Sequence, residues 1–351
     1  MSDQQVEADG RTKFPYDSTG VGGKTSSSSS DDPMTLTILG CGNLGIAILS
    51  GILSSPTSNS SKSSRGGSPT SSQDVPPKVP TRFITCVTRP QSAKRIKNEL
   101  EHLHPRLTIL QNHNLRGVRE ADVVLLGCKP YHLKKVLQEE GIREALAGKL
   151  LISILAGVSV QQIEETLYGE DFSRTPSLEP ALEGRCRVVR VMPNTASLVC
   201  ESMTVIATSD PPLPRDLDAL VTWMFNRIGR VVHLSPAQMD ASTALCGSGP
   251  AFCALMLEAL ADGAVAMGIP RAEAQLMAAQ TMRGTSGLVL NGEHPAMLRE
   301  KVSTPGGCTI GGLLVLEEGS VRGTVSRSVR EATVVASQLG KGAQGVNGTR
   351  F

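Results

Sequence analysis

A glycine-rich turn that joins an apolar run to a helical pattern is the feature that most restricts the fold of this chain. The run Thr35–Leu39 is rich in β-formers, and Gly40-Cys41-Gly42-Asn43-Leu44-Gly45 leads from it into a helical pattern that ends at Leu53. In this context the first glycine permits a tight turn, the second lets the backbone approach a pyrophosphate, and the third allows close helix packing. The free N–H groups of the helix N-terminus also favour phosphate. The segment therefore predicts a dinucleotide site, with an ordinary glycine-rich turn as the alternative, and its candidate residues are Gly40, Gly42, Asn43, Leu44 and Gly45.

Apolar runs that alternate with helical patterns continue the first part of the chain. The apolar runs are Arg82–Val87, Ala121–Gly127, Leu150–Leu155 and Val188–Val191. Helical patterns lie between them at Ser92–His102, Tyr131–Glu139 and Val160–Leu167. Strands that alternate with helices are typical of a doubly wound parallel sheet, so we expect an α/β fold with an N-terminal Rossmann-like domain.

Only helical patterns follow from about Pro236. They cover Ala251–Met267, the stretch from Pro270 to about Leu290, Ile310–Glu318 and Val321–Leu339. Long alanine-rich helices with few aromatic residues favour an all-α domain that buries one face against another subunit, with a self-contained bundle as the alternative. The length of 351 residues is compatible with two domains. We therefore expect a dinucleotide-binding domain at 34–235 and a helical substrate and dimerisation domain at 236–341.

Polar segments flank or interrupt these domains. Residues 1–33 contain a serine run and cannot bury enough apolar surface to offset the entropy of ordering, so a disordered tail is predicted there. Residues 54–80 predict a flexible Ser/Pro-rich insertion, which costs little because the entropy of loop closure grows slowly with length. A smaller insertion is expected at Ser173–Gly184 and a flexible tail at 342–351.

Charge and cysteine usage argue against several classes of protein. A net charge of +2 gives no electrostatic case for nucleic acid or for an anionic membrane. The eight cysteines form no CxxC and no Cys/His cluster with zinc spacing, so we expect reduced thiols and no metal. The run Met34–Leu53 lacks charge, but its glycines and hydroxyl residues fit a strand, turn and helix better than a membrane span. The N-terminus resembles neither a signal peptide nor a presequence, and a cytoplasmic protein is expected.

The end of the second apolar run indicates which dinucleotide binds. NAD sites usually carry an acidic residue there for the ribose hydroxyls, whereas NADP sites use an arginine for the additional phosphate. Here the strand ends in Thr88 and Arg89 with no acid, and Lys94 and Arg95 on the next helix could assist. Arg89 can form a charge-assisted fork to the phosphate. We expect NADPH, with NADH possible, and the alternative is that Arg89 is a solvated surface charge.

Two further loops and two helix starts supply other candidates. The loops Cys128-Lys129-Pro130 and Pro193-Asn194-Thr195 follow buried strands, where ligands of such sheets bind, although Lys129 and Asn194 also suit ordinary turns. The segments Gly247-Ser248-Gly249-Pro250 and Thr304–Thr309 precede helices with small residues, hydroxyls and free N–H groups. Such a setting suits an anionic group such as a carboxylate. The six histidines form no pair or triad spacing, so a bound cofactor would carry the chemistry.

These segments together resemble the pyrroline-5-carboxylate reductase family. The resemblance rests on the Gly247–Ala251 segment, on Ser303–Leu313, and on Lys129-Pro130 and Met192–Thr195 in the first domain, and it extends from about Leu36 to Leu339 without the insertions. It implies reduction of 1-pyrroline-5-carboxylate to L-proline by NAD(P)H, the last step of proline biosynthesis. It also implies a homodimer or a higher homo-oligomer.

The resemblance further implies roles for individual residues. Thr309 falls on the hydroxyl that hydrogen-bonds the ring nitrogen and is the candidate catalytic residue. Asn114 falls on a cofactor-ribose position, and Lys129 and Asn194 fall on the nicotinamide side. The candidate substrate residues are Ser303, Thr304, Gly306, Gly307, Cys308 and Ser248; the candidate cofactor residues outside the glycine turn are Thr88, Arg89, Asn114, Cys128, Lys129, Pro130 and Asn194.

Some positions depart from the family pattern, and other functions remain open. Ala196 stands where the family often has proline, and Cys200-Glu201-Ser202 replaces a Gly-Glu-Gly-like stretch. A related two-domain NADP-dependent dehydrogenase or imine reductase acting on another small acid is one alternative. A catalytic lysine on the first long helix would favour the dehydrogenase, but Ala251–Met267 contains none. A non-catalytic, cofactor-sensing scaffold is the second alternative.

Overall fold

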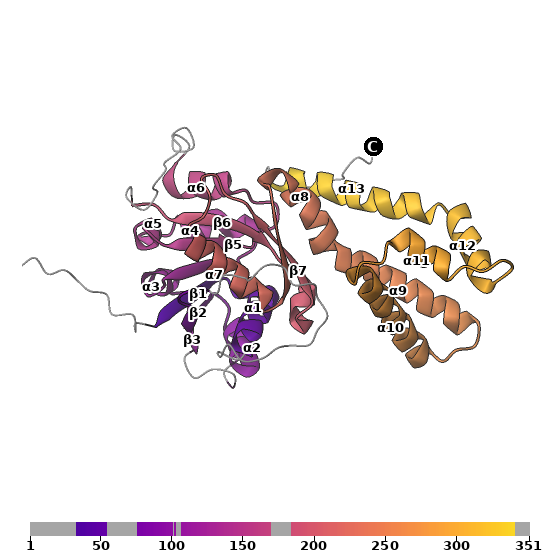
Figure 1. Ribbon diagram of the computed structural model, residues 1–351. Coiled ribbons are helices and arrows are strands. Elements are labelled where there is room, and N and C mark those ends of the chain that lie inside the picture. Colours follow the sequence, from indigo (N-terminus) through magenta and orange to yellow (C-terminus); the bar gives the residue numbers. More distant parts are fainter. Residues whose placement is uncertain (1–32, 55–75, 101, 103–106, 170–183, 341–351) are drawn as a thin grey trace, which may run out of the picture. The chain divides into compact units, whose positions relative to one another are not determined.

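The computed structural model describes residues 33–54, 76–100, 102, 107–169 and 184–340 (Figure 1). Most of the predicted N-terminal tail, of the insertion at 54–80 and of the smaller insertion at 173–184, together with the predicted C-terminal tail, lies outside these residues. The predicted boundary of the first insertion is slightly wrong, because Pro80 already pairs with Met34 as the first residue of a strand.

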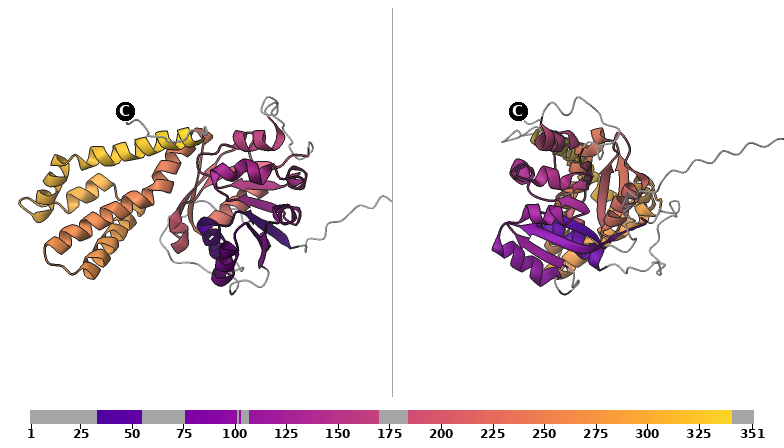
Figure 2. Two further views of the ribbon diagram at one scale, coloured as in Figure 1. Left: turned by 180° about the vertical axis from the view of Figure 1, so that it is seen from behind. Right: turned by 90° about the vertical axis from the view of Figure 1, so that its left-hand side faces the viewer.

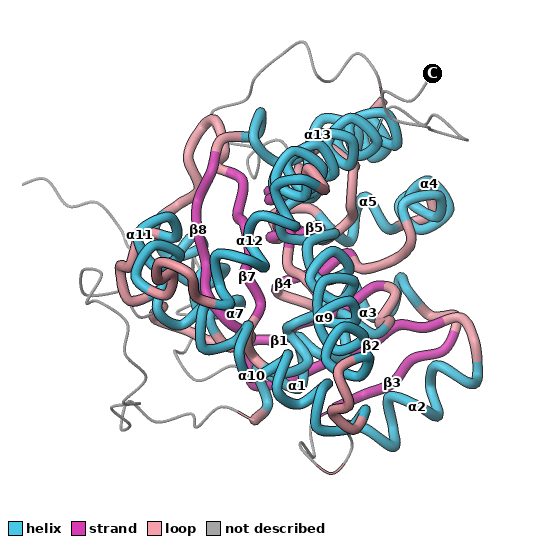
Figure 3. The backbone as a smooth tube through the Cα atoms, turned by 90° about the vertical axis from the view of Figure 1, so that its right-hand side faces the viewer, coloured by secondary structure: helices cyan, strands magenta, loops and turns pink. Residues whose placement is uncertain are grey.

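The described residues form one eight-stranded sheet with the strand order β3-β2-β1-β4-β5-β6-β7-β8 (Figure 3). The strands are β1 (Met34–Leu39), β2 (Pro80–Val87), β3 (Leu107–Gln111), β4 (Val123–Leu126), β5 (Leu150–Ser153), β6 (Arg187–Met192), β7 (Ser202–Ala207) and β8 (Gly229–Leu234). All neighbouring strands in this sheet are parallel except β6 and β7. The order reverses direction beside β1, which is the topological switch point where ligands of such sheets bind.

Helices cover both faces of this sheet, as Figures 1 and 2 show. One face packs against α1 (Asn43–Leu53), α2 (Pro90–Leu100) and α7 (Arg215–Asn226), and the other against α3 (Asn114–Arg119), α4 (Leu133–Leu137), α5 (Ile142–Leu146) and α6 (Val160–Tyr168). Successive side chains of a strand point to opposite faces. Leu36 and Ile38 accordingly belong to the first core and Leu39 to the second. This arrangement confirms the predicted doubly wound α/β fold.

Three strands and three helices of the described first domain were not expected from the sequence. They are β3, β7, β8, α3, α5 and α7. The antiparallel pairing of β7 follows from its short connection to β6, which the 3₁₀ turn η4 (Thr195–Val199) fills. A parallel neighbour would need a crossover of a dozen or more residues. The sheet is therefore mixed at this end and parallel around the glycine turn.

The chain continues from Pro236 as helices, as predicted. They are η5 (Pro236–Gln238), α8 (Met239–Ser242), the π-helical turn η6 (Thr243–Ser248), α9 (Gly249–Ala266), α10 (Arg271–Leu290), α11 (Pro295–Lys301), α12 (Cys308–Glu318) and α13 (Val321–Gly340). Helices α9 and α10 pack side by side, and α13 returns to pack on α8 and η6. The helix start expected at Gly247-Ser248-Gly249-Pro250 needs correction, because α9 follows directly on η6 within one helical run.

Large apolar side chains of these helices are exposed in the single chain. Leu255 on α9 is 68% exposed, Leu276 on α10 is 69% exposed and Val315 on α12 is 65% exposed. Within the described residues, the helical run Pro236–Ala266 is long and apolar enough to cross a membrane by length and composition alone. The run Met34–Leu53, considered from its sequence, forms β1, a turn and α1 instead.

Candidate functional site

The glycine turn lies where the carboxyl ends of β1, β2 and β4 meet. Gly40 has a φ of +81°, and its N–H donates to the Cys86 carbonyl at 3.0 Å. A Cβ on Gly40 would lie 2.7 Å from the Cα of Cys128, closer than real side chains approach a backbone. A Cβ on Gly42 would instead meet nothing within 4 Å, and this residue is exposed. The turn thus leaves open space above Gly42 at the N-terminus of α1, which fits the approach of a pyrophosphate.

The third glycine of the fingerprint brings α1 close to its strand. A Cβ on Gly45 would lie 3.1 Å from the Cys41 sulfur and 3.4 Å from Ile38 Cγ2. Cys41 itself is 2% exposed, and burial raises the pKa of its thiol to about 12. Burial likewise raises the pKa of Cys128 to about 11. Both thiols therefore remain neutral and place no negative charge beside a phosphate.

A second cationic side chain reaches the glycine turn from α2. Thr88 and Arg89 are exposed directly after β2, as predicted. Arg95, which the sequence suggested only as an assistant, donates from Nη1 to Asn43 Oδ1 at 2.5 Å. Among the residues that the structure describes, its buried Nε has no hydrogen-bond partner and lies 3.9 Å from Glu99 Oε1. In the sequence, Arg95 is a basic residue in the second turn of the helix after β2. Such a residue lies beside the glycine turn only when α2 packs against α1.

The remaining cofactor candidates follow neighbouring strands. Lys129 is exposed after β4 as the N-cap of the 3₁₀ turn η1 (Pro130–His132), and Cys128 contacts the glycine turn. Asn114 begins α3 after β3, and its side-chain Nδ2 donates to Glu139 Oε2 at 2.9 Å. The sheet thus brings candidates from β1, β2, β3 and β4 to one edge. Their roles toward a cofactor stay predictions.

Asn194 after β6 is held by contacts within the protein. It is the N-cap of η4, and its Oδ1 accepts from the Ala196 N–H at 3.0 Å. Its Nδ2 donates to the Cys246 carbonyl in η6 at 3.0 Å, and its own N–H donates to Ser202 Oγ at 3.1 Å. Both ends of the side-chain amide are therefore engaged, which the sequence did not indicate.

The segment before α12 is a tight turn. The Gly307 N–H donates to the Thr304 carbonyl at 3.0 Å, and Gly306 has a φ of +67°. Proline followed by a glycine with positive φ is the pattern of a type II turn. Ser303 Oγ donates to the Arg299 carbonyl at 2.8 Å. The half-buried Thr309 lies in the first turn of α12, and among the described residues no hydrogen bond engages its hydroxyl.

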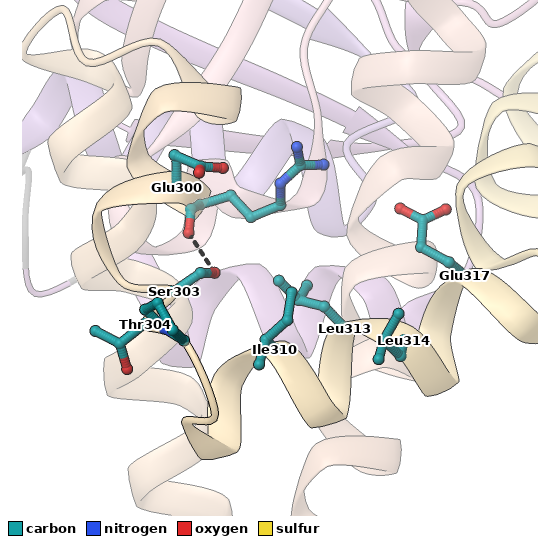
Figure 4. A pocket seen from close by; sticks show the side chains of 9 residues that line it. Glu300, Ser303, Thr304, Ile310, Leu313, Leu314 and Glu317 are labelled. Atoms are coloured by element: carbon teal, nitrogen blue, oxygen red, sulfur yellow. Dashed lines mark hydrogen bonds between the residues drawn. The ribbon is translucent and has the colours of Figure 1, made fainter.

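A cavity of about 440 Å³ opens beside this turn (Figure 4). Ser303 and Thr304 line one end of it, and Ile310, Leu313 and Leu314 of α12 form an apolar wall. Glu317 closes the other end, and the hydrogen bond from Arg322 lowers the pKa of its carboxyl. The cavity is lined only by residues of α11, α12 and their connection. The structure therefore joins Ser303 and Thr304 in one cavity, but neither Ser248, Thr309 nor the cofactor edge lines it.

The fold is that of a dinucleotide-binding protein with a separate helical domain, and the comparisons with known proteins place it among the NADP-dependent oxidoreductases. Residues 35–157 match a family described as NADP oxidoreductase, coenzyme F420-dependent, and residues 236–339 match one described as pyrroline-5-carboxylate reductase dimerisation. A pyrroline-5-carboxylate reductase of Lophium arboricola is 62% identical and covers 91% of this chain and 97% of its own. One from Neurospora crassa is 53% identical, over 92% of this chain and 98% of its own. The chain belongs to the pyrroline-5-carboxylate reductase family.

A solved structure agrees with the fold. The Plasmodium falciparum pyrroline carboxylate reductase with NADP bound has a TM-score of 0.66 and covers 88% of this chain and 98% of its own. Its sequence identity to this chain is 24%, so the similarity supports the architecture alone.

Proposed function

We propose that this protein reduces 1-pyrroline-5-carboxylate to L-proline with NADPH as the reductant. The observation that carries this proposal is the 62% identity to a pyrroline-5-carboxylate reductase over nearly the full length of both chains. The open glycine turn and the Thr304–Gly307 turn before α12 supply sites that fit the cofactor and the substrate. The proposed division of labour is a dinucleotide-binding domain at 34–235 and a substrate and dimerisation domain at 236–341.

The cofactor edge is suited to NADPH. The exposed backbone at Gly42 and the N-terminus of α1 would hold the pyrophosphate. Arg89 and Thr88, exposed after β2, would hold the phosphate that distinguishes NADPH from NADH. Arg95 reaches the turn through Asn43 and adds positive charge beside it. When bound, the nicotinamide supplies the hydride.

The helical domain would hold the substrate. The hydroxyl of Thr304 and N–H groups of the turn offer donors to the carboxylate, and Ser303, whose hydroxyl donates to the Arg299 carbonyl, would hold the turn beside it. The Thr309 hydroxyl would bond the ring nitrogen and hold it in place while the imine carbon accepts the hydride. The nitrogen gains one proton, for which this hydroxyl is the proposed relay. Proximity and orientation contribute up to about 7–11 kcal/mol in favourable cases of this kind.

A second copy of the chain would complete the site. The cavity beside Ser303 lacks residues of the cofactor edge, and the apolar side chains of α9, α10 and α12 are exposed. Burying those faces in a homodimer, or in a higher homo-oligomer, would remove a large apolar surface from water. We propose that the apolar run Pro236–Ala266 serves this association. We also propose that the protein is cytoplasmic and has no membrane or nucleic-acid partner.

The test of the function is NADPH oxidation by the purified protein with 1-pyrroline-5-carboxylate. We expect rapid oxidation with proline as the product, and faster turnover with NADPH than with NADH. Absence of turnover with both cofactors, in folded protein that binds NADPH, would refute the substrate assignment.

Replacing Arg89 with alanine tests how the cofactor is chosen. The variant loses a charged hydrogen bond to the additional phosphate of NADPH. We therefore expect its KM for NADPH to rise about 10-fold or more. NADH lacks this phosphate, so its KM stays within about twofold and serves as the internal control. Steady-state kinetics with both cofactors measure the effect, and equal changes for the two would contradict the role of Arg89.

A further inference from the structure

Every second residue of β6 and of the loop that follows it faces the start of the helical domain. Arg190 is 7% exposed, and its Nη2 lies 3.2 Å from Asp240 Oδ1 on α8. Met192 packs so closely on η6 that a Cβ on Gly247 would lie 2.8 Å from its Cε. Asn194 donates from Nδ2 to the Cys246 carbonyl. Because side chains alternate along a strand, residues 190, 192 and 194 form one continuous seam against α8 and η6.

The Cys246 carbonyl lies one turn before a proline that cannot donate to it. In an α-helix the N–H of residue 250 would donate to the carbonyl of residue 246. Residue 250 is Pro250, which has no N–H. The π-helical geometry of Thr243–Ser248 marks the same disturbance of the ladder. Pro250 therefore cannot donate to the Cys246 carbonyl, and the side-chain amide of Asn194 does.

The same side chain also shapes the loop at the cofactor edge. Oδ1 of Asn194 caps η4 through the Ala196 N–H, and η4 packs against α1, whose N-terminus carries the glycine turn. One planar amide thus ties η4 to η6, and η6 ends in Ser248, a candidate substrate residue. Each end of this amide thus makes one hydrogen bond within the protein.

We propose that Asn194 is a positioning residue that locks the η6 turn, and with it Ser248, against the cofactor edge. In this role it acts through the Cys246 carbonyl instead of contacting the nicotinamide. The kinetic consequence rests on the proposed reductase function, whereas the structural consequence does not.

The first experiment measures deuterium uptake in residues 243–249 of the full-length protein without cofactor. Asn194→Ser keeps a hydroxyl that can cap η4 but is too short to reach Cys246. We expect uptake in this segment at least about 5-fold faster than in the wild type, since a broken hydrogen bond lowers the local cost of opening. The matched control is Ser197→Ala on the same turn, whose buried hydroxyl has no hydrogen-bond partner among the described residues and whose loss should leave uptake unchanged.

A rescue variant isolates the Cys246 carbonyl. Pro250→Ala restores a main-chain N–H four residues after Cys246, so the double variant Asn194→Ser/Pro250→Ala should return the uptake toward that of the wild type. Wild-type uptake in Asn194→Ser alone would overturn the proposal. Fast uptake that Pro250→Ala does not reverse would trace the effect to η4 and would overturn it as well.

Kinetics separate positioning from a cofactor contact. In Asn194→Ser we expect kcat to fall about 10-fold while the dissociation constant of NADPH stays within about twofold, because a misplaced site loses orientation but not affinity. Pro250→Ala should recover part of the lost kcat. A dissociation constant for NADPH raised 10-fold or more would point to direct contact with the cofactor and would refute the proposed role.

Discussion

Replacing Thr309 with alanine is expected to lower kcat by about 100-fold or more and to leave the dissociation constant of NADPH within about twofold. A positioned group that transfers a proton contributes typically 10²–10⁴-fold. The Thr309 hydroxyl lies in the first turn of α12, directly after the turn formed by Thr304–Gly307, and no hydrogen bond among the described residues engages it. It is therefore available to a ring nitrogen held beside that turn.

The matched variant for this prediction is Thr309→Ser, which keeps the hydroxyl and removes only a methyl group. Its kcat should stay within about tenfold of the wild-type value, far above that of Thr309→Ala. Single-turnover measurements with saturating NADPH separate the chemical step from product release. Turnover of Thr309→Ala at the wild-type rate would exclude the hydroxyl from the reaction.

Replacing Gly40 with alanine is expected to abolish measurable NADPH binding and to destabilise the fold. A left-handed backbone costs an alanine roughly 1–2 kcal/mol, and the φ of Gly40 is +81°. The new Cβ would also lie 2.7 Å from Cys128 Cα and 2.8 Å from its backbone nitrogen, so a strand end must move. We expect the free energy of unfolding to fall by about 2 kcal/mol or more, measured by urea denaturation.

Gly42→Ala is the contrasting variant on the same turn. Its φ of −89° suits alanine, and a Cβ there meets nothing within 4 Å. The free energy of unfolding should therefore change by no more than about 0.5 kcal/mol, while the methyl group occupies the space of the pyrophosphate and raises the dissociation constant of NADPH about 10-fold or more. Unchanged affinity in this variant would place the pyrophosphate elsewhere.

The first half of the fold could be predicted because local rules and sheet geometry act together there. The run Thr35–Leu39, the turn at Gly40 and the helix after it each follow from short-range sequence, and they occur as β1, the turn and α1. Parallel strands align their carboxyl ends, so the loops at Thr88 and Lys129 could be expected at one edge without knowing any distance. Strands β7 and β8 escaped because they lie past the alternating pattern. Strand β7 joins the sheet antiparallel to β6 by a short connection, and β8 pairs parallel to β7 after α7.

The candidate substrate site was predicted as small residues and hydroxyls before a helix, and the turn within it was not described. Proline followed by two glycines indicates the reversal at Thr304–Gly307, and the structure has it. The 440 Å³ cavity beside it depends on how α11 and α12 pack, which no short-range pattern describes. The helix start expected at Ser248 was wrong in detail, because η6 continues the helix backward from α9.

The amino-acid sequence by itself determined the glycine turn, the alternation of strands and helices, the helical second part and the family. Those features depend on backbone preferences and side-chain periodicity within a few residues, so they can be inferred along the chain. Tertiary structure alone decided that Arg95 reaches Asn43 and that Asn194 donates to the Cys246 carbonyl, since these partners are 52 positions apart in both cases. Such hydrogen bonds depend on which distant segments pack together, and that packing is a property of the whole folded chain.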